Sequence, residues 1–193
     1  MLHRTGQAVL RPGLFFLRRQ RGFTMVELVV VIVLVGILGA VATARYADRG
    51  SFDASAYAEQ SRAMLRYGQK IAVAQRRPVF VVFSTGRIAL CFDLACSVAG
   101  RVPGAGGANS GSKATVASCA AVNWYCEGTP DTLAYTLQGA SPGSFAFDGL
   151  GVPYAAGDAI ASGTSSFRGL VVRISGDGAN RDIAVSAQTG HVL

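Results

Sequence analysis

The hydrophobic pattern divides the chain into an apolar first part and a mixed second part. Residues 23–44 form an almost continuous apolar run in which Glu27 is the only charged residue. As a helix this run spans about 33 Å, enough to cross a bilayer core that is roughly 30 Å thick. No later segment is comparable, so the run predicts one membrane-spanning helix with an outward domain behind it. A charged side chain inside a bilayer costs about 2.5–3.5 kcal/mol or more, so the position of Glu27 needs a physical reason.

Helical spacing continues beyond this run. Apolar residues recur three, four or seven positions apart and predict one stripe along a helix, made of Phe52, Ala56, Ala63, Tyr67, Ile71 and Ala74. Pro78 ends the pattern, because proline disfavours helical geometry in the residue before it. Residues 45–77 are therefore predicted to be an amphipathic helix that continues the membrane helix.

After Pro78 the pattern becomes that of β-strands. Residues 79–83 and 87–92 predict a hairpin. Residues 97–118 are rich in Gly, Ser and Ala and predict a long, mobile loop. Residues 169–175 and 182–187 predict a C-terminal antiparallel meander. The expected fold class is α+β, with the long N-terminal helix packed on a C-terminal antiparallel β-sheet.

The basic charge is concentrated ahead of the apolar run. The net charge is +7, and five arginines with no acidic residue precede Phe23, namely Arg4, Arg11, Arg18, Arg19 and Arg21. Seven less these five leaves +2 for the rest of the chain. Positive residues beside a membrane helix keep their side of it in the cytoplasm. The charge therefore indicates membrane orientation and is poor evidence for a nucleic-acid partner.

Four cysteines follow the apolar run: Cys91, Cys96, Cys119 and Cys126. The expected orientation places them outside the cytoplasm, where disulfides persist. Their spacing, C-x4-C-x22-C-x6-C, fits zinc only loosely and only at the first pair. We therefore expect two disulfides and no metal. Three connectivities are open, and we favour the local pairs Cys91–Cys96 and Cys119–Cys126.

Groups suited to catalysis are sparse in the outward domain. His191 is its only histidine, the cysteines are expected to be oxidised, and no G-x-S-x-G elbow occurs. The Gly-Asp-Gly motif at residues 176–178 lacks further calcium ligands at the required spacing and predicts a hairpin turn. The sequence therefore disfavours an enzyme and predicts no cofactor.

The most specific motif lies where the basic segment meets the apolar run. It reads RGFTMVELVVVIVLVGILGAV, with Gly22, Phe23, Thr24 and Glu27 in fixed order before a long apolar helix. This segment resembles the N-terminus of type IV prepilins and type II secretion pseudopilins. That family has a basic leader ending in Gly, an aromatic first mature residue, Thr, an apolar pair and then Glu. The resemblance is strong over about the first fifth of the chain.

The resemblance implies that residues 1–22 are a leader peptide. A membrane-embedded prepilin peptidase would cut between Gly22 and Phe23 on the cytoplasmic face and N-methylate Phe23. Gly22 is then the position that the peptidase recognises, and the catalytic residues belong to the peptidase. The expected partners are this peptidase, other pilins in a helical filament and the inner-membrane assembly platform.

The same resemblance gives Glu27 a function in assembly. Residues 23–44 would form the filament core, and residues 78–193 would form the head domain. In the core, Glu27 of one subunit can pair with the Phe23 amine of its neighbour, which offsets two charges that are costly alone. Such a buried polar pair also selects one register between helices.

Within this family a structural subunit is favoured. We expect first a minor pilin of the MSHA type (MshC-like), held by one span in the inner membrane with a periplasmic head, and later part of a pilus at the cell surface. The nearest alternative is a GspH-like minor pseudopilin of type II secretion. The segments FAFDGLGVP and DIAVSAQTGHV resemble the C-terminal sheets of FimT/GspH-like subunits. Ala44 stands where many major pilins have proline, which argues against an abundant major pilin.

Another class is a FimT-like minor pilin that binds DNA for uptake. It needs exposed basic side chains on the sheet or tail, and the candidates are Arg168, Arg173 and Arg181. The tail AQTGHVL contains no arginine, and the charge after the leader is small. DNA binding, like a membrane-anchored enzyme, is therefore less favoured than the structural function.

Overall fold

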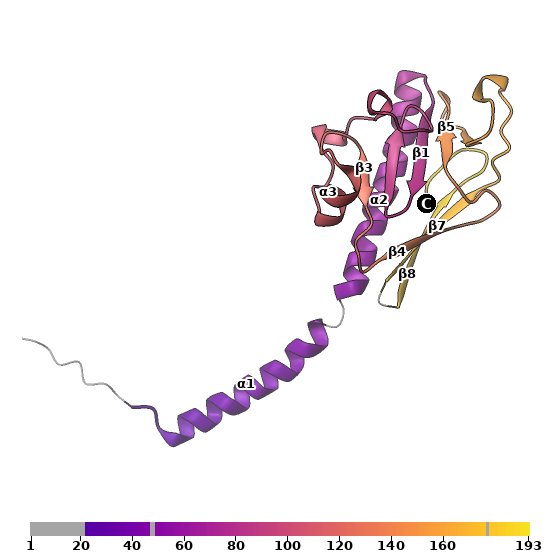
Figure 1. The fold of residues 1–193 in the computed structure, drawn as a ribbon. Helices are drawn as coiled ribbons and strands as arrows, with labels where there is room; N and C mark the ends of the chain where they lie inside the picture. Colours follow the sequence, from indigo (N-terminus) through magenta and orange to yellow (C-terminus); the bar gives the residue numbers. More distant parts are fainter. Residues whose placement is uncertain (1–21, 47–48, 177) are drawn as a thin grey trace, which may run out of the picture. The chain divides into compact units, whose positions relative to one another are not determined.

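The computed structural model describes residues 22–46, 49–176 and 178–193 (Figure 1). Apart from Gly22, the expected leader lies outside these residues. The chain divides into two compact units, Met1–Ala44 and Arg45–Leu193. The first unit holds most of helix α1, and the second holds helix α2 and all of the strands.

Helix α1 covers Met25–Tyr46 and has Glu27 in its first turn. The large apolar side chains from Val26 to Leu38 are all between 44% and 73% exposed. Among the described residues, no helix meets the length and hydrophobicity that a membrane crossing requires.

Helix α2 covers Arg49–Gln75 and packs on the strands of the second unit. Its buried positions recur three and four residues apart: Ala54, Tyr57, Ala58, Ser61, Met64, Leu65, Gly68 and Ala72. The predicted stripe is only partly correct: Tyr67 and Ile71 are half-buried and pack against the core, whereas the other four members are exposed. The buried face is centred about one residue, or roughly 100°, away. Helix and sheet approach closely at Gly68, where an added Cβ would stand only 3.0 Å from Leu90.

The larger sheet is antiparallel throughout. Its strand order is β3-β2-β1-β5-β6, with β1 at Val79–Ser84, β2 at Arg87–Cys91, β3 at Cys126–Gly128, β5 at Phe145–Phe147 and β6 at Pro153–Ala155. β1 and β2 form the predicted hairpin, with Val81 opposite Leu90. Gly86 in its turn has a φ of +73°, which glycine adopts without strain.

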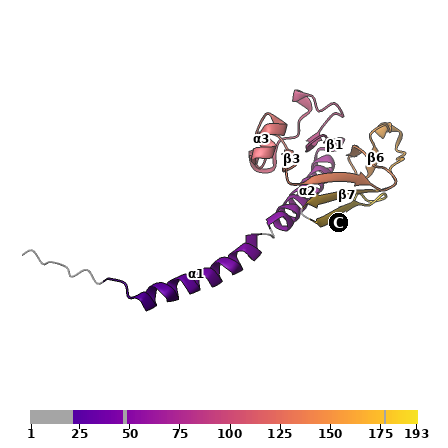
Figure 2. The same ribbon diagram turned by 60° about the horizontal axis from the view of Figure 1, so that its bottom comes forward.

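The smaller sheet is also antiparallel and has the order β4-β7-β8. Its strands are β4 at Ala134–Gln138, β7 at Leu170–Gly176 and β8 at Ala179–Val185. β8 begins before the predicted residue 182, because pairing with β7 continues to the Gly176–Ala179 pair. Helix α2 contacts strands of both sheets (Figures 1 and 2). The α+β class, with a helix packed on antiparallel strands, is confirmed, although two sheets occur where one was predicted.

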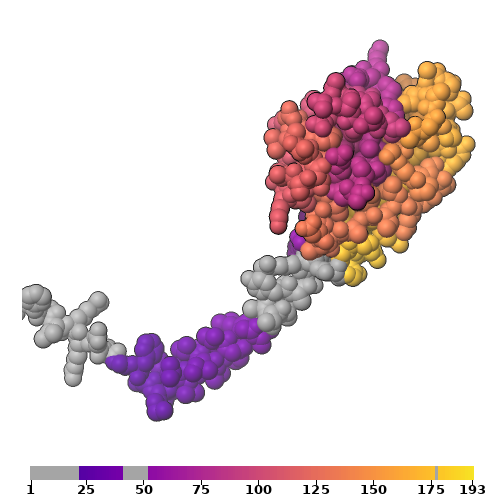
Figure 3. All heavy atoms as spheres, viewed as in Figure 1, coloured from indigo at the N-terminus to yellow at the C-terminus, as the bar shows by residue number. Residues whose placement is uncertain are grey.

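The Gly/Ser-rich segment predicted as a mobile loop has structure of its own. It contains the 3-10 turns η1 at Val98–Gly100 and η2 at Ala105–Gly107, and the helix α3 at Lys113–Cys119. A further 3-10 turn, η3, lies at Ile160–Ser162. The Ser112 hydroxyl caps α3 by accepting a hydrogen bond from Thr115 N at 3.2 Å. Residues around α3 cover one flank of the second unit (Figure 3), so this part of the chain is a packed substructure.

Tyr57 makes the stability of the second unit depend on pH. Its side chain is buried on α2, and its hydroxyl lies 3.0 Å from Thr129 Oγ1. Burial is the main cause that raises the pKa of Tyr57 to about 12. In the unfolded chain the tyrosine pKa is about 10. The unfolded state therefore loses this proton first, and stability should fall by at most about 3 kcal/mol as the pH rises from about 10 to 12.

Urea denaturation of the wild type and of a Tyr57→Phe variant at about pH 9 and pH 11.5 measures this effect. The variant should lose less stability between the two conditions, because it lacks the titrating hydroxyl. Equal losses in the two proteins would show that Tyr57 does not cause the alkaline destabilisation.

Candidate processing and assembly site

The first turn of α1 is fixed by residues of the predicted motif. Thr24 precedes the helix, and its hydroxyl accepts a hydrogen bond from the Glu27 amide at 3.2 Å. The Thr24 carbonyl accepts from the Leu28 amide at 3.1 Å. A threonine three residues before a glutamate has the spacing of a capping box. The sequence analysis missed this role of Thr24, although the T-x-x-E spacing indicates it.

Gly22 and Phe23 lie in open surroundings just before this cap. A Cβ added at Gly22 would meet no atom within 4 Å, and Phe23 is 74% exposed. Within the part of the chain that the structure describes, the peptide bond between them is therefore accessible to another protein.

Glu27 has a favourable position in α1 and no ion-pair partner among the described residues. The N-terminal end of a helix favours a negative charge, and Glu27 lies in the first turn of α1. No side chain among residues 22–46, 49–176 and 178–193 forms an ion pair with it. The apolar side chains around it are exposed, and a helix that is apolar all round is normally covered by lipid or other helices. The first turn of α1 therefore presents an exposed acid within an exposed apolar surface.

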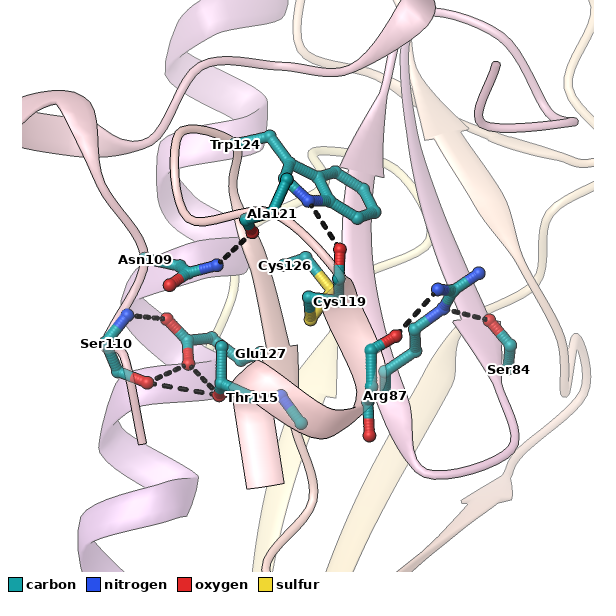
Figure 4. Close-up of a disulfide and its surroundings, with 12 residues drawn as sticks. Ser84, Arg87, Asn109, Ser110, Thr115, Cys119, Ala121, Trp124, Cys126 and Glu127 are labelled. Carbon is teal, nitrogen blue, oxygen red and sulfur yellow. Dashed lines mark hydrogen bonds between the residues drawn. A yellow bond between two sulfur atoms is a disulfide. The ribbon is translucent and has the colours of Figure 1, made fainter. Parts of the chain in front are cut away.

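The structure pairs Cys91 with Cys96 and Cys119 with Cys126. These are the local pairs among the three connectivities that the spacing leaves open. The Cα atoms are 5.2 Å and 5.9 Å apart. The second disulfide joins the end of α3 to the start of β3 (Figure 4). All four cysteines of the chain are thus engaged, which leaves no thiol for a nucleophile or a metal ligand.

A buried acid that the sequence analysis missed lies close to this disulfide (Figure 4). Glu127 on β3 is 2% exposed. Its carboxyl group accepts hydrogen bonds from Ser110 N and Thr115 Oγ1, each at 2.9 Å, and from Ser110 Oγ. Thr115 Oγ1 also accepts from Gly128 N at 2.9 Å. This network attaches α3 and the segment before it to the sheet.

The three arginines proposed as nucleic-acid contacts have different surroundings. Arg173 forms a double hydrogen bond with Asp182 across β7 and β8, at 2.8 Å and 2.7 Å. This hydrogen-bonded pairing raises the pKa of Arg173 and lowers the pKa of Asp182. Arg181 donates to Ser55 Oγ on α2 at 3.1 Å, and Arg168 donates to the carbonyls of two neighbouring residues. The charge of Arg173 is therefore offset within the chain.

Other titratable groups do not gather into a reactive cluster within the described residues. No three His, Cys, Asp or Glu side chains among them could hold a metal ion. His191 is exposed at a turn, where its backbone amide donates to Thr189 Oγ1 at 3.2 Å.

Residues 17–43 match the family described as the prokaryotic N-terminal methylation motif. This range includes Arg18, Arg19 and Arg21 ahead of the apolar run, the Gly22–Phe23 bond and Glu27. The chain carries the N-terminal methylation motif of type IV prepilins. The expected resemblance to prepilins is thereby confirmed, while the MSHA or GspH subtype stays a prediction.

Two solved structures also resemble this chain in part. They are two crystal forms of the type IV minor pilin FimU of Pseudomonas aeruginosa strain PAO1. Sequence identities are 17% and 18%, both TM-scores are 0.43, and the matches cover 72% of this chain and 85% and 90% of the FimU chains. A comparison with curated proteins gives no match. The prepilin motif is therefore the finding on which a functional assignment rests.

Proposed function

We propose that this protein is a minor pilin or pseudopilin, a structural subunit that joins a type IV-like filament or primes its assembly. The observation that carries the proposal is the prepilin motif at residues 17–43. Within it, an accessible Gly22–Phe23 bond, a capped helix and Glu27, which forms no ion pair with the residues that the structure describes, follow one another. These features suit a protein that is cut at one bond and then packed against other helices.

In this proposal a prepilin peptidase cuts after Gly22 on the cytoplasmic face and N-methylates the new amine of Phe23. Residues 23–44 are held in the inner membrane, and the arginines before them keep the leader in the cytoplasm. The head of residues 78–193 then lies in the periplasm, where its two disulfides persist. After extraction by the assembly platform, the subunit becomes part of a pilus or pseudopilus.

Glu27 acts between subunits in the assembled filament. The apolar helices bundle, and Glu27 of one subunit pairs with the Phe23 amine of the next, so that neither charge is left alone in an apolar core. The exposed apolar side chains from Val26 to Leu38 support this bundling, because a helix that is apolar all round requires cover.

Among filament systems we favour an MSHA-type pilus, with a GspH-like place in type II secretion as the alternative. Both systems use the same processing chemistry, so the processing motif does not distinguish them. The genes that neighbour the gene of this protein would show to which system it belongs. A FimT-like DNA-binding minor pilin is less favoured, because Arg173 is already paired with Asp182. Salt-sensitive binding of duplex DNA by the protein would promote it.

N-terminal mass analysis of the protein from its native host tests the proposal. The mature chain should begin at Phe23 and carry one added methyl group. A Gly22→Val variant should accumulate as the precursor with its leader, because a branched side chain obstructs the cut. The matched control is Gly36→Val, since a Cβ at Gly36 also meets no atom within 4 Å, and this variant should be processed. Normal processing of Gly22→Val would contradict the prepilin assignment.

A further inference from the structure

Strand β4 forms one edge of the smaller sheet, and its outer side is uncovered (Figure 1). It pairs with β7 along its whole length, Ala134–Gln138. On the other side, its backbone N–H and C=O groups bond to no other residue in the described part of the chain. Ala134, Thr136 and Gln138 are exposed. A row of backbone donors and acceptors along β4 is therefore open to solvent.

The other sheet edges in the described residues are covered or short. On β8, Ala184 and Leu193 exchange two backbone hydrogen bonds, and Arg62 of α2 donates to Asp182 O at 3.3 Å. Helix α3 packs against β3. Strand β6 has three residues and begins with Pro153, which has no N–H to donate. Covering elements, short length and proline all prevent the addition of a further strand.

The sequence of β4 has none of the usual protection of an open edge. Its residues are Ala-Tyr-Thr-Leu-Gln, with no charge and no proline. Charged residues and proline are the side chains that natural sheets place on an exposed edge to stop another strand from pairing there. The edge of β4 can therefore accept an extended segment.

A hollow of about 740 Å³ lies beside β4 and the turn between β1 and β2. Its large apolar wall residues are Phe83, Leu133, Tyr135 and Leu137. Side chains alternate between the two faces of a strand, and paired strands keep the same alternation. Every second side chain of an added strand would thus face the same side as Tyr135 and Leu137, toward the hollow, and should be apolar. The side chains between them would face solvent, as Thr136 does.

The charge at this edge favours a basic partner. Among the described residues that line the hollow, Asp131 is the only charged one. Asp131 is exposed and forms no ion pair within the described part of the chain. A second copy of β4 would not supply a cation, because residues 129–143 contain no Lys, Arg or His. Charge complementarity therefore argues for a different protein at this edge.

We propose that the β4 edge binds an extended segment of another protein, which adds to the smaller sheet as a fourth strand. The segment alternates apolar and polar residues and carries Lys or Arg at the end that lies beside Asp131. Backbone hydrogen bonds to β4 supply affinity, and the hollow and Asp131 supply specificity. This surface lies in the head and does not depend on the prepilin motif.

A short peptide of this pattern tests the proposal. We would add acetylated and amidated Lys-Val-Thr-Val-Thr-Val-Thr, or the reversed sequence for the opposite strand direction, to the full chain, oxidised and in detergent micelles. The measurement is backbone hydrogen exchange of residues 131–138, with β8 as the internal reference. At a peptide concentration about ten times its Kd, one of the two peptides should slow exchange in β4 about tenfold. Exchange in β8 should not change.

Substitutions in the peptide and in the protein separate the two parts of the recognition. Replacing the central Thr of the peptide by Pro should abolish binding, because proline removes a backbone donor from the added strand. Asp131→Lys should weaken binding about threefold or more, because repulsion replaces attraction between exposed charges. Glu59→Lys makes the same change in net charge on the exposed side of α2, and this matched control should bind like the wild type. A peptide with Glu in place of Lys should prefer Asp131→Lys to the wild type.

Four outcomes would overturn the proposal. One is exchange in β4 that neither peptide slows, and another is equal binding of the proline-containing peptide, which would mean that no strand is added. These two use the wild-type protein, so they decide the question even if Asp131→Lys fails to fold. The third is equal affinity in Asp131→Lys and Glu59→Lys. The fourth is protection of β4 that rises with protein concentration when no peptide is present, which would assign the edge to a second copy of the chain.

Discussion

The Glu27→Ala variant should be cleaved after Gly22 like the wild type and should fail to enter filaments. Cleavage depends on the open Gly22–Phe23 bond, which this substitution leaves unchanged. A filament assembled from the variant, in contrast, would contain Phe23 amines without the Glu27 counter-charge. An unpaired charge in an apolar core is strongly destabilising. The measurement is the ratio of subunit in sheared filaments to subunit in the membrane fraction, with mass analysis to confirm the cut.

Two control variants test whether the expected assembly defect comes from the lost charge of Glu27. Glu27→Gln keeps the size and the T-x-x-Q capping spacing, so a loss of assembly in this variant assigns the effect to the charge. Glu59→Ala removes an exposed acid from α2 whose ion pair, within the described part of the chain, is with Arg62 on the same helix, and this variant should assemble normally. Wild-type incorporation of Glu27→Ala would refute the charge-pair mechanism.

The Glu127→Ala variant should destabilise the second unit by about 3 kcal/mol, because it leaves the buried Thr115 hydroxyl without its acceptor and removes two hydrogen bonds from the exposed Ser110. The bonds lost are those donated by Thr115 Oγ1, Ser110 N and Ser110 Oγ. Because the network attaches α3 to β3, the loss should appear first in the region around α3. Urea denaturation with the disulfides intact gives the change in stability, and hydrogen exchange locates it.

Asp131→Ala is the matched control for Glu127. Asp131 is exposed and lies only four residues further along the chain. Its removal should change stability by no more than about 0.5 kcal/mol. A similar loss in both variants would mean that Glu127 has no special structural role.

Local patterns in the sequence predicted those elements that depend on neighbouring residues. The apolar run gave the position of α1, which begins at Met25. The alternating residues after Pro78 gave the hairpin of β1 and β2. The N-terminal methylation motif was also readable, because its residues, among them Gly22, Phe23 and Glu27, follow one another at fixed spacing along the chain.

The face of α2 could not be predicted, because the sheet determines it. Apolar spacing favoured the side of Phe52, but Phe52 is 76% exposed. The buried face instead mixes small residues such as Ala54 and Gly68 with the large Met64 and Leu65. The fit to the sheet, which apolar spacing along the chain does not specify, decides the orientation.

The hydrogen-bond network of the head could not be predicted for another reason. Its members, Ser110, Thr115 and Glu127, are 5, 12 and 17 residues apart, so they form no local sequence motif. The segment around them looked like a loop because its Gly and Ser content is high. Its order comes from a capped helix, a buried acid and a disulfide, and these become visible only when distant residues meet.

The short span of the two disulfides determines how the head would respond to force. The paired cysteines are 5 and 7 residues apart. When a folded chain is stretched, a disulfide prevents the extension only of the residues between its two cysteines, and each residue adds about 3.3–3.6 Å to an extended chain. The two disulfides together would therefore shorten the fully extended chain by at most a few tens of ångströms. Mechanical resistance must then come from strand pairing and from contacts such as that of Arg66 Nη2 with Val192 O at 2.9 Å. A subunit pulled within a loaded fibre should thus extend almost fully while both cross-links stay intact.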